Sequence, residues 1–151
     1  MCMSQAEIKD NSVADPGLNT LIEQAYHAAE HAYAPYSHFR VGAAIRLQNG
    51  AIVTGANVEN VSFGLTICAE RSALVRAVAE HGPKIRITAV AVVNLNAAAS
   101  PPCGACRQML SEFALPDAPV VFPAAEGRRV MTFREILPLA FDMTLTTLPG
   151  H

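Results

Sequence analysis

The chain has 151 residues, of which 51% are hydrophobic and 16% are charged, and its net charge is −2. This length suits one domain with a substantial core and is too short to predict two. The weak negative charge argues against a nucleic-acid-binding protein, because such proteins display clustered basic residues that displace counterions. The one small basic cluster, Arg128-Arg129, is expected to be a solvated turn beside Gly127.

The amino-terminal sequence and the cysteine content both indicate a cytoplasmic protein. The first residues lack a basic start and an apolar stretch, so we expect no secretory signal, and no membrane-length apolar run follows. Of the four cysteines, Cys68, Cys103 and Cys106 fit one metal site and only Cys2 is left over, which disfavours a disulfide framework. Residues 1–15 are expected to form a flexible tail, and residues 16–151 a single domain.

The first helix and the first two strands have clear boundary signals. Asp15-Pro16 predicts a helix start, with Asp15 as N-cap and Pro16 at the first helical position, and the helical spacing of apolar residues extends to near Pro35. Residues 41–47 and 52–56 flank Asn49-Gly50. Because Asn-Gly favours a tight primed turn, these two segments are expected to pair as an antiparallel hairpin.

The middle of the chain predicts a helix, a buried strand and a further helix. The second helix is expected from Cys68 to about Glu80, where Gly82-Pro83 ends it. Residues 85–94 are almost continuously apolar, which is typical of a central strand covered on both faces. Pro101-Pro102 then opens a third helix over residues 103–113.

The last part of the chain predicts a short strand at residues 119–122, with Val130-Met131 as the candidate for a fifth. Thr132 and Glu135 have the spacing of a capping box, so a short helix is expected to start there. Strands that alternate with helices indicate a layered α/β sandwich around a mixed sheet.

Two short motifs carry the chemistry, Cys68-x-Glu70 and Pro102-Cys103-x-x-Cys106. Cys103 and Cys106 stand three residues apart, so on a helix they share one face and can bind one ion with Cys68. Three protein ligands leave the fourth position of a tetrahedral zinc open, which is typical of a catalytic site. Glu70 is then the candidate proton carrier, since it is a carboxylate beside the metal that does not bind it.

A structural zinc site is the alternative for these cysteines. Such a site normally fills all four positions with cysteine or histidine. His38 and His81 are the only remote candidates for a fourth ligand, and neither stands at a suitable spacing from the three cysteines. The structural interpretation is therefore disfavoured.

The two motifs resemble those of the zinc cytidine deaminases, including the variant in which all ligands are cysteines. Further segments, Tyr36 to Ala44, Asn57 to Asn60 and Leu137 to Phe141, occur in the order seen in the small homotetrameric branch of that family. The resemblance covers roughly residues 17–141. It implies a three-layer α/β/α sandwich with a mixed five-stranded sheet, one Zn²⁺ per subunit and a homotetramer.

The resemblance also implies the reaction, which is hydrolytic deamination of cytidine and deoxycytidine to uridine and deoxyuridine in pyrimidine salvage. Glu70 would move protons between water and the cytosine ring, while Cys68, Cys103 and Cys106 hold the metal. Arg71 would offset the excess negative charge of three thiolates around one zinc.

The same resemblance assigns the substrate contacts. Asn57 and Glu59 would point outward from the end of the second strand and bind the ribose hydroxyls, and Glu59 would repel a phosphate, so free nucleosides fit better than nucleotides. Phe39 would line the base pocket, and the backbone of Ala69 would bind the amide edge of the ring. Phe141 would reach into the active site of a neighbouring subunit and stack on the base.

Residues 57–60 have a second interpretation, in which an asparagine side chain forms a turn that closes the second strand. Asn60 is a better candidate for this turn than the Asn57–Glu59 pair.

Three positions depart from the commoner pattern of the family. Phe63 stands where many members have tyrosine, and Gly64 and Thr66 stand where some have proline and glycine. These changes leave open the shape of the pocket around the 4-amino group. A deaminase of a modified or 4-substituted cytosine nucleoside, or of an antibiotic such as blasticidin S, is therefore the alternative.

Two more distant alternatives are disfavoured. A polynucleotide editor would need a basic channel and usually carries histidine where this chain has Cys68. A non-catalytic, zinc-stabilised binding module would have no need of Glu70 beside the metal.

Overall fold

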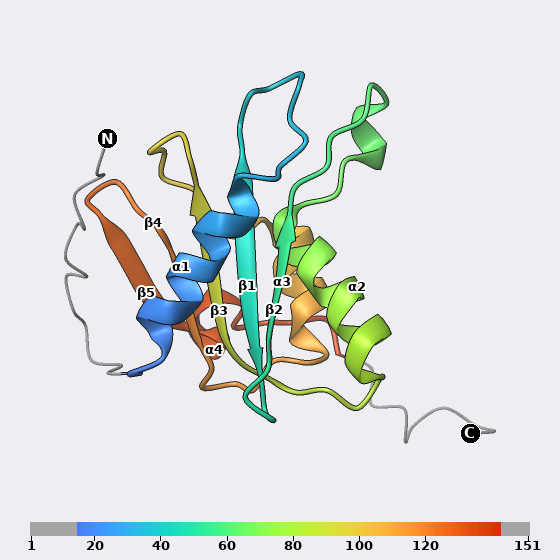
Figure 1. Ribbon diagram of the computed structural model, residues 1–151. Coiled ribbons are helices and arrows are strands. Elements are labelled where there is room, and N and C mark those ends of the chain that lie inside the picture. The colour runs from blue at the N-terminus through green and yellow to red at the C-terminus, as the bar shows by residue number, and fades with distance from the viewer. Residues whose placement is uncertain (1–14, 143–151) are drawn as a thin grey trace.

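A single mixed sheet of five strands, in the order β2-β1-β3-β4-β5, organises the chain (Figure 1). The computed structural model describes residues 15–142. The strands are β1 (Val41–Leu47), β2 (Ile52–Ala56), β3 (Ile87–Asn94), β4 (Pro119–Pro123) and β5 (Arg128–Thr132). The helices are α1 (Leu18–Ala29), α2 (Ala69–His81), α3 (Gly104–Ser111), α4 (Phe133–Ile136) and the short 3-10 helix η1 (Phe63–Leu65).

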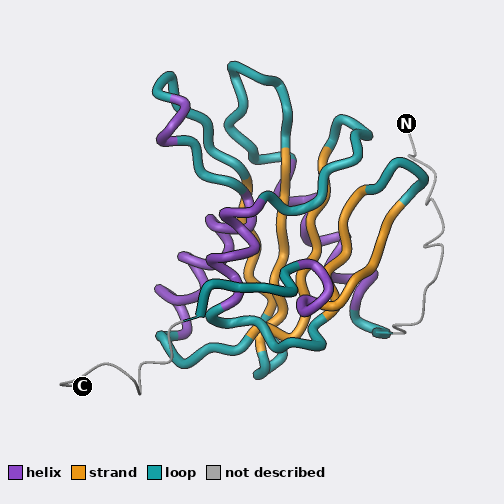
Figure 2. The backbone as a smooth tube through the Cα atoms, turned by 180° about the vertical axis from the view of Figure 1, so that it is seen from behind, coloured by secondary structure: helices purple, strands orange, loops and turns teal. Residues whose placement is uncertain are grey.

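Helices cover both faces of the sheet, which confirms the predicted three-layer α/β/α sandwich. Helix α1 lies on one face, and α2, α3 and α4 lie on the other (Figures 1 and 2). The alternation of side chains along β3 supplies both cores, because Ala91 and Val93 pack with α1 while Val90 and Val92 pack on the opposite side. The strand predicted over residues 85–94 is thus confirmed as a central strand buried on both faces, although it begins two residues later, at Ile87.

The predicted hairpin is confirmed, since β1 and β2 pair antiparallel with Ile45 opposite Val53. Gly50 at the turn has a φ of 85°, a left-handed conformation that glycine adopts without strain. The next strand, β3, pairs antiparallel with β1 and parallel with β4, so the sheet is mixed. Helix α3 therefore lies in the crossover that connects the parallel strands β3 and β4.

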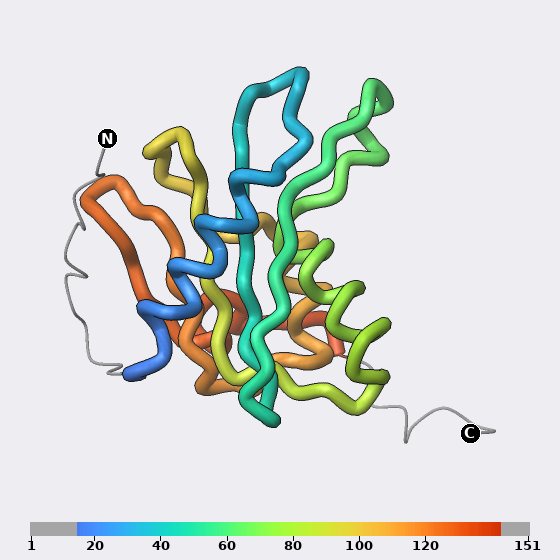
Figure 3. The backbone as a smooth tube through the Cα atoms, viewed as in Figure 1, coloured from blue at the N-terminus to red at the C-terminus, as the bar shows by residue number. Residues whose placement is uncertain are grey.

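Two loops that flank the candidate site extend together beyond one end of the sheet. Figure 3 shows the segment before β1 beside the segment after β2, on the same side of the molecule. A bridge joins them, in which the Tyr33 amide donates to the Asn57 carbonyl at 3.0 Å and the Glu59 amide donates to the Tyr33 carbonyl at 2.8 Å. The ends of β1 and β2 are thereby held next to each other.

The predicted start and end of the first helix are wrong. The N-cap of α1 is Gly17 and not Asp15, and the helix ends at Ala29 rather than near Pro35. The Asp15 carboxylate accepts a hydrogen bond from the Gly17 amide at 2.9 Å and also pairs with the guanidinium of Arg46 on β1, with 2.8 Å between Oδ1 and Nη1. Asp15 therefore ties the start of α1 to the sheet.

The sequence analysis predicted the strand and the helix near the carboxyl terminus correctly, but it was wrong about Arg128-Arg129. The candidate fifth strand is confirmed as β5 and the capping box of Thr132 and Glu135 is present. Arg128-Arg129, expected in a turn, instead begins β5, and the Arg128 guanidinium carbon lies 5.6 Å from the centroid of the Tyr26 ring. No helix within residues 15–142 has the length and hydrophobicity needed to cross a membrane.

Candidate active site

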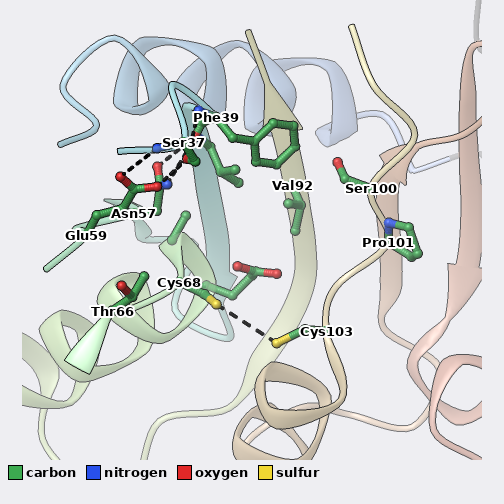
Figure 4. A pocket seen from close by; sticks show the side chains of 13 residues that line it. Ser37, Phe39, Asn57, Glu59, Thr66, Cys68, Val92, Ser100, Pro101 and Cys103 are labelled. Carbon is green, nitrogen blue, oxygen red and sulfur yellow. Dashed lines mark hydrogen bonds between the residues drawn. The ribbon is translucent and has the colours of Figure 1, made fainter. Parts of the chain in front are cut away.

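Three cysteine thiols meet where α2 and α3 begin. Cys68 is the N-cap of α2, Cys103 is the N-cap of α3, and Cys106 lies buried in the first turn of α3. The Sγ atoms of Cys68 and Cys103 are 3.9 Å apart (Figure 4), and those of Cys103 and Cys106 are 3.4 Å apart. Both helix starts offer free amide groups and a favourable dipole end for negative sulfur.

The spacing and chemistry of these thiols fit a zinc ion. The three sulfur atoms all lie within 4.8 Å of one another. Ligands of a regular tetrahedral zinc with Zn–S bonds of about 2.3 Å are separated by about 3.8 Å. The Cys68–Cys103 separation of 3.9 Å is close to this value, and the Cys103–Cys106 separation of 3.4 Å is somewhat shorter. Within residues 15–142, this is the one cluster of three or more cysteine, histidine or acidic side chains able to hold a metal. His38 and His81 are not part of it.

The surroundings shift the pKa values of Cys68 and Cys106 in opposite directions. A hydrogen bond from Cys106, opposed by partial burial and supported by Arg71, lowers the pKa of Cys68 to about 5. The hydrogen bond to Cys68, together with burial and the charge of Glu70, raises the pKa of Cys106. The surroundings of Cys68 thus favour its thiolate, which is the form of cysteine that binds zinc.

Arg71 lies where it can offset the charge of the thiolates. Its Nη2 atom is 3.7 Å from Cys68 Sγ and also donates to the Thr66 carbonyl at 3.2 Å. Its Nε atom is buried and has no hydrogen-bond partner among the described residues. The guanidinium is therefore held beside the thiol of Cys68.

Glu70 lies in the first turn of α2, one residue after the buried Ala69. Only 4% of Glu70 is exposed, and its side chain lines the same cavity as Cys68 and Cys103. Burial, assisted by the negative charge of Cys68, raises the pKa of the Glu70 carboxyl. A carboxyl whose protonated form is favoured by burial can accept a proton and return it during a reaction.

The cavity in front of the cysteines has a volume of about 280 Å³. Figure 4 shows Phe39 on the side away from the Cys68–Cys103 pair. The lining includes seven predicted residues, namely Phe39, Asn57, Glu59, Cys68, Ala69, Glu70 and Cys103. It also includes Thr66, which the sequence analysis named as a departure from the family pattern, and five residues that it missed, Ser37, Val41, Val92, Ser100 and Pro101.

Some of the missed lining residues carried a usable signal. Ser100 and Pro101 directly precede the Pro102-Cys103 motif, and Ser37 lies in the segment used for the family resemblance. Val92 had no such signal, because its pattern is that of any buried strand residue.

Asn57 does not point outward, which corrects the predicted orientation. It is buried, its Oδ1 atom accepts from the Val41 amide at 2.8 Å, and its Nδ2 atom donates to the Phe39 carbonyl at 2.8 Å. Asn57 thus fixes the backbone at the start of β1 on both sides of Arg40. The second Nδ2 hydrogen is not used in these contacts.

Glu59 is held by the turn that precedes Phe39. Its carboxylate accepts from the Tyr36 amide at 2.9 Å, from the Ser37 amide at 3.2 Å and from the Ser37 hydroxyl. The Ser37 hydroxyl is the largest contribution that lowers the pKa of Glu59, so this side chain is an anion at neutral pH. The turn for which Asn60 was the candidate is also present, because Asn60 Oδ1 accepts a hydrogen bond from the Ser62 amide at 2.9 Å.

Phe141 lies outside the cavity of its own chain. Its residue surface is 74% exposed, and its backbone is held by the side chain of Gln108 on α3. The ring therefore remains free to contact another molecule.

Comparison with known proteins identifies the family. The sequence pattern of the cytidine and deoxycytidylate deaminase zinc-binding region matches residues 17–122, which include the three cysteines and Glu70. The chain belongs to the cytidine and deoxycytidylate deaminase family. In this deaminase, Cys68, Cys103 and Cys106 form the cluster able to hold the zinc ion for which the matched region is named.

Relatives and solved structures agree with this assignment. Cytidine deaminase from Halalkalibacterium halodurans is 45% identical over 122 residues, which cover 80% of this deaminase and 91% of the relative. The Mycobacterium tuberculosis enzyme is 42% identical over 129 residues, with 85% and 92% covered. Crystal structures of cytidine deaminases from Burkholderia pseudomallei and M. tuberculosis superpose with TM-scores of 0.73 and 0.72 at 45% and 39% identity. These alignments cover 82% and 85% of this chain and 98% and 100% of the solved chains.

Proposed function

We propose that this protein is a zinc-dependent cytidine deaminase that hydrolyses cytidine and deoxycytidine to uridine and deoxyuridine and releases ammonia. The observation that carries the proposal is the buried Glu70 carboxyl in a cavity that also contains the thiols of Cys68 and Cys103. The sequence relatives that cover most of the chain are cytidine deaminases. They do not favour the alternative of a blasticidin-type deaminase.

Glu70 carries the protons of the reaction. When zinc is held by the three cysteines, it supplies a Lewis acid that makes water a nucleophile at neutral pH. Glu70 takes a proton from the attacking water, delivers it to N3 of the cytosine ring, and assists the departure of ammonia with a second transfer. Burial raises the pKa of the Glu70 carboxyl, so its protonated form is more accessible than that of an exposed glutamate.

The cavity orients a nucleoside with its base toward the metal cluster. Phe39 packs against the pyrimidine, and the backbone of Ala69 binds the amide edge of the ring. Asn57, through its unused amide hydrogen, and the Glu59 carboxylate bind the ribose hydroxyls. Since Glu59 is ionised, a 5′-phosphate near it is disfavoured, and free nucleosides are the substrates.

Exposed apolar side chains support a homotetramer with shared active sites. The loop between β2 and α2 exposes Val61, Phe63 and Leu65 by 76%, 77% and 66%, and the carboxyl-terminal segment exposes Leu139 and Phe141 by 92% and 74%. Such surfaces are commonly buried between subunits. In the proposed assembly, Phe141 enters a neighbouring active site and stacks on the base.

The proposed setting is pyrimidine salvage in the cytoplasm. Cys68, Cys103 and Cys106 must remain reduced to bind zinc, and the cytoplasm keeps thiols in that state.

The test is ultraviolet-monitored turnover of a substrate panel by the zinc-loaded protein, with ammonia measured in the same samples. The panel contains cytidine, deoxycytidine, 4-substituted cytidines, cytosine, CMP and blasticidin S. We expect one ammonia per uridine or deoxyuridine formed and little turnover of CMP. Turnover of blasticidin S or of a 4-substituted cytidine without turnover of cytidine would overturn the proposal.

A further inference from the structure

The side chain of Gln108 forms a two-point clamp on the backbone of Phe141. The Phe141 amide donates to Gln108 Oε1 at 3.1 Å, and Gln108 Nε2 donates to the Phe141 carbonyl at 2.8 Å. A primary amide carries one acceptor and one donor side by side, which matches the amide and carbonyl of a single residue. The clamp joins positions 33 residues apart in the sequence.

Arg107, the residue before Gln108, also attaches the carboxyl-terminal segment to α3. Arg107 Nη1 donates to the Ile136 carbonyl at 3.2 Å, and Arg107 Nε donates to the Pro102 carbonyl at 2.7 Å. Two consecutive side chains of α3 thus hold the carboxyl-terminal segment at residues 136 and 141. The same helix is capped by Cys103 and carries Cys106, so the segment is attached to the element that positions two thiols of the metal cluster.

The side chain of Phe141 does not provide this attachment. With 74% of the residue exposed, it has little packing within its own chain, and Leu139 beside it is 92% exposed. Hydrogen bonds to the backbone therefore determine where the ring is placed. Fixing the backbone before the substrate binds reduces the entropy lost when the ring is ordered on a ligand.

We propose that Gln108 is a positioning residue, which acts through Phe141 to present the aromatic ring to the nucleoside bound in a neighbouring subunit. This inference rests on the proposed function, specifically on the shared active site. It assigns to Gln108 a role in substrate affinity and no role in proton transfer or in metal binding.

The test is a double-mutant cycle on the full-length, zinc-loaded protein, with Gln108→Met, Phe141→Ala and the double variant. Methionine keeps the length and helix propensity of glutamine and removes both hydrogen bonds. Two neutral hydrogen bonds, each at the low end of the usual net contribution, correspond to a rise in KM for cytidine of about five- to tenfold, with kcat changed by less than about twofold. Gln24→Met is the matched control, because Gln24 is exposed on α1, away from the clamp.

Three readouts accompany the kinetics and separate positioning from general damage to the fold. Zinc content per chain and the midpoint of thermal unfolding should match the parent protein in Gln108→Met. Hydrogen exchange of the Phe141 amide should be faster in this variant, because its acceptor is lost. In the Phe141→Ala background, Gln108→Met should leave KM unchanged, since the ring through which it acts is absent.

The outcomes distinguish failure of this inference from failure of the shared site. If Phe141→Ala raises KM while Gln108→Met does not, or if the two effects add in the double variant, the inference is wrong and the shared site stands. If Phe141→Ala leaves KM unchanged, the shared site is wrong, and the role proposed for Gln108 falls with it. Loss of zinc from Gln108→Met would also contradict the inference, because it would indicate a role in the metal cluster.

Discussion

Gly55 on β2 lies directly against the backbone of Ala73 in α2. A Cβ atom at position 55 would be 2.3 Å from the Ala73 nitrogen and 2.6 Å from the Ala69 carbonyl oxygen. Helix α2 can therefore approach the sheet closely only because position 55 has no side chain. This approach places the first turn of α2, with Glu70, at the cavity.

We predict that Gly55→Ala destabilises the protein. Backbone atoms of α2 cannot move aside as a flexible side chain would, so the free energy of unfolding should fall by about 1–3 kcal/mol. Gly64→Ala is the matched control, since a Cβ at that position meets no atom within 4 Å and should change stability by less than about 0.5 kcal/mol. Urea denaturation of both variants measures the difference. Equal stability of the two would contradict the close packing of β2 and α2.

Removal of one thiol should remove the metal. Cys103→Ala leaves two protein ligands, so we expect loss of zinc and of the stability that metal binding adds. Cys2→Ala, which deletes the same group from a residue outside the described part of the chain, should retain both. Zinc content by atomic absorption and the unfolding midpoint with and without a chelator are the measurements. A Cys103→Ala protein that remains fully metallated would show that Cys103 is not a ligand.

The pair of Asp15 and Arg46 predicts a stability term that depends on pH. The hydrogen bond from Arg46 lowers the pKa of the Asp15 carboxyl below its ordinary value, so the folded state binds its proton less tightly than the unfolded state does. The stabilisation is therefore fully present above about pH 4, the ordinary aspartate value, and is lost as the pH falls through the lower folded-state pKa.

Asp15→Asn measures this term. Because the pair remains partly in contact with solvent, the variant should be less stable than the parent by at most about 1 kcal/mol at neutral pH. The difference should shrink below about pH 4. Asp117→Asn is the control, since the Asp117 and Arg134 side chains are 82% and 66% exposed and their pair should contribute little. A stability difference for Asp15→Asn that persists unchanged at low pH would contradict the role of the ion pair.

Local signals were sufficient for most of the fold. Asn49-Gly50 determines the hairpin through the turn it prefers, and the capping box of Thr132 and Glu135 marks α4 through contacts three residues apart. The pairing of Cys103 with Cys106 was predictable for a similar reason, because the two are local neighbours at the start of α3, whereas Cys68 comes from the start of α2.

Contacts between distant segments account for what the sequence did not predict. Aspartate is a preferred N-cap residue, but the carboxylate of Asp15 is bound by Arg46, which is 31 residues away. Asn57 turns inward because the backbone at the start of β1 offers it both a donor and an acceptor. The clamp between Gln108 and Phe141 likewise depends on where the carboxyl-terminal segment returns to α3. No local sequence pattern predicts this contact.

The most direct test of the account is the activity of zinc-loaded Glu70→Gln with cytidine. Glutamine keeps the size and hydrogen-bonding capacity of the side chain but cannot carry the proton, so zinc per chain should equal that of the parent while kcat falls by about 10²- to 10⁴-fold. Turnover at the parent rate in a variant with full zinc content would contradict the role of Glu70 and, with it, the proposed chemistry of this site.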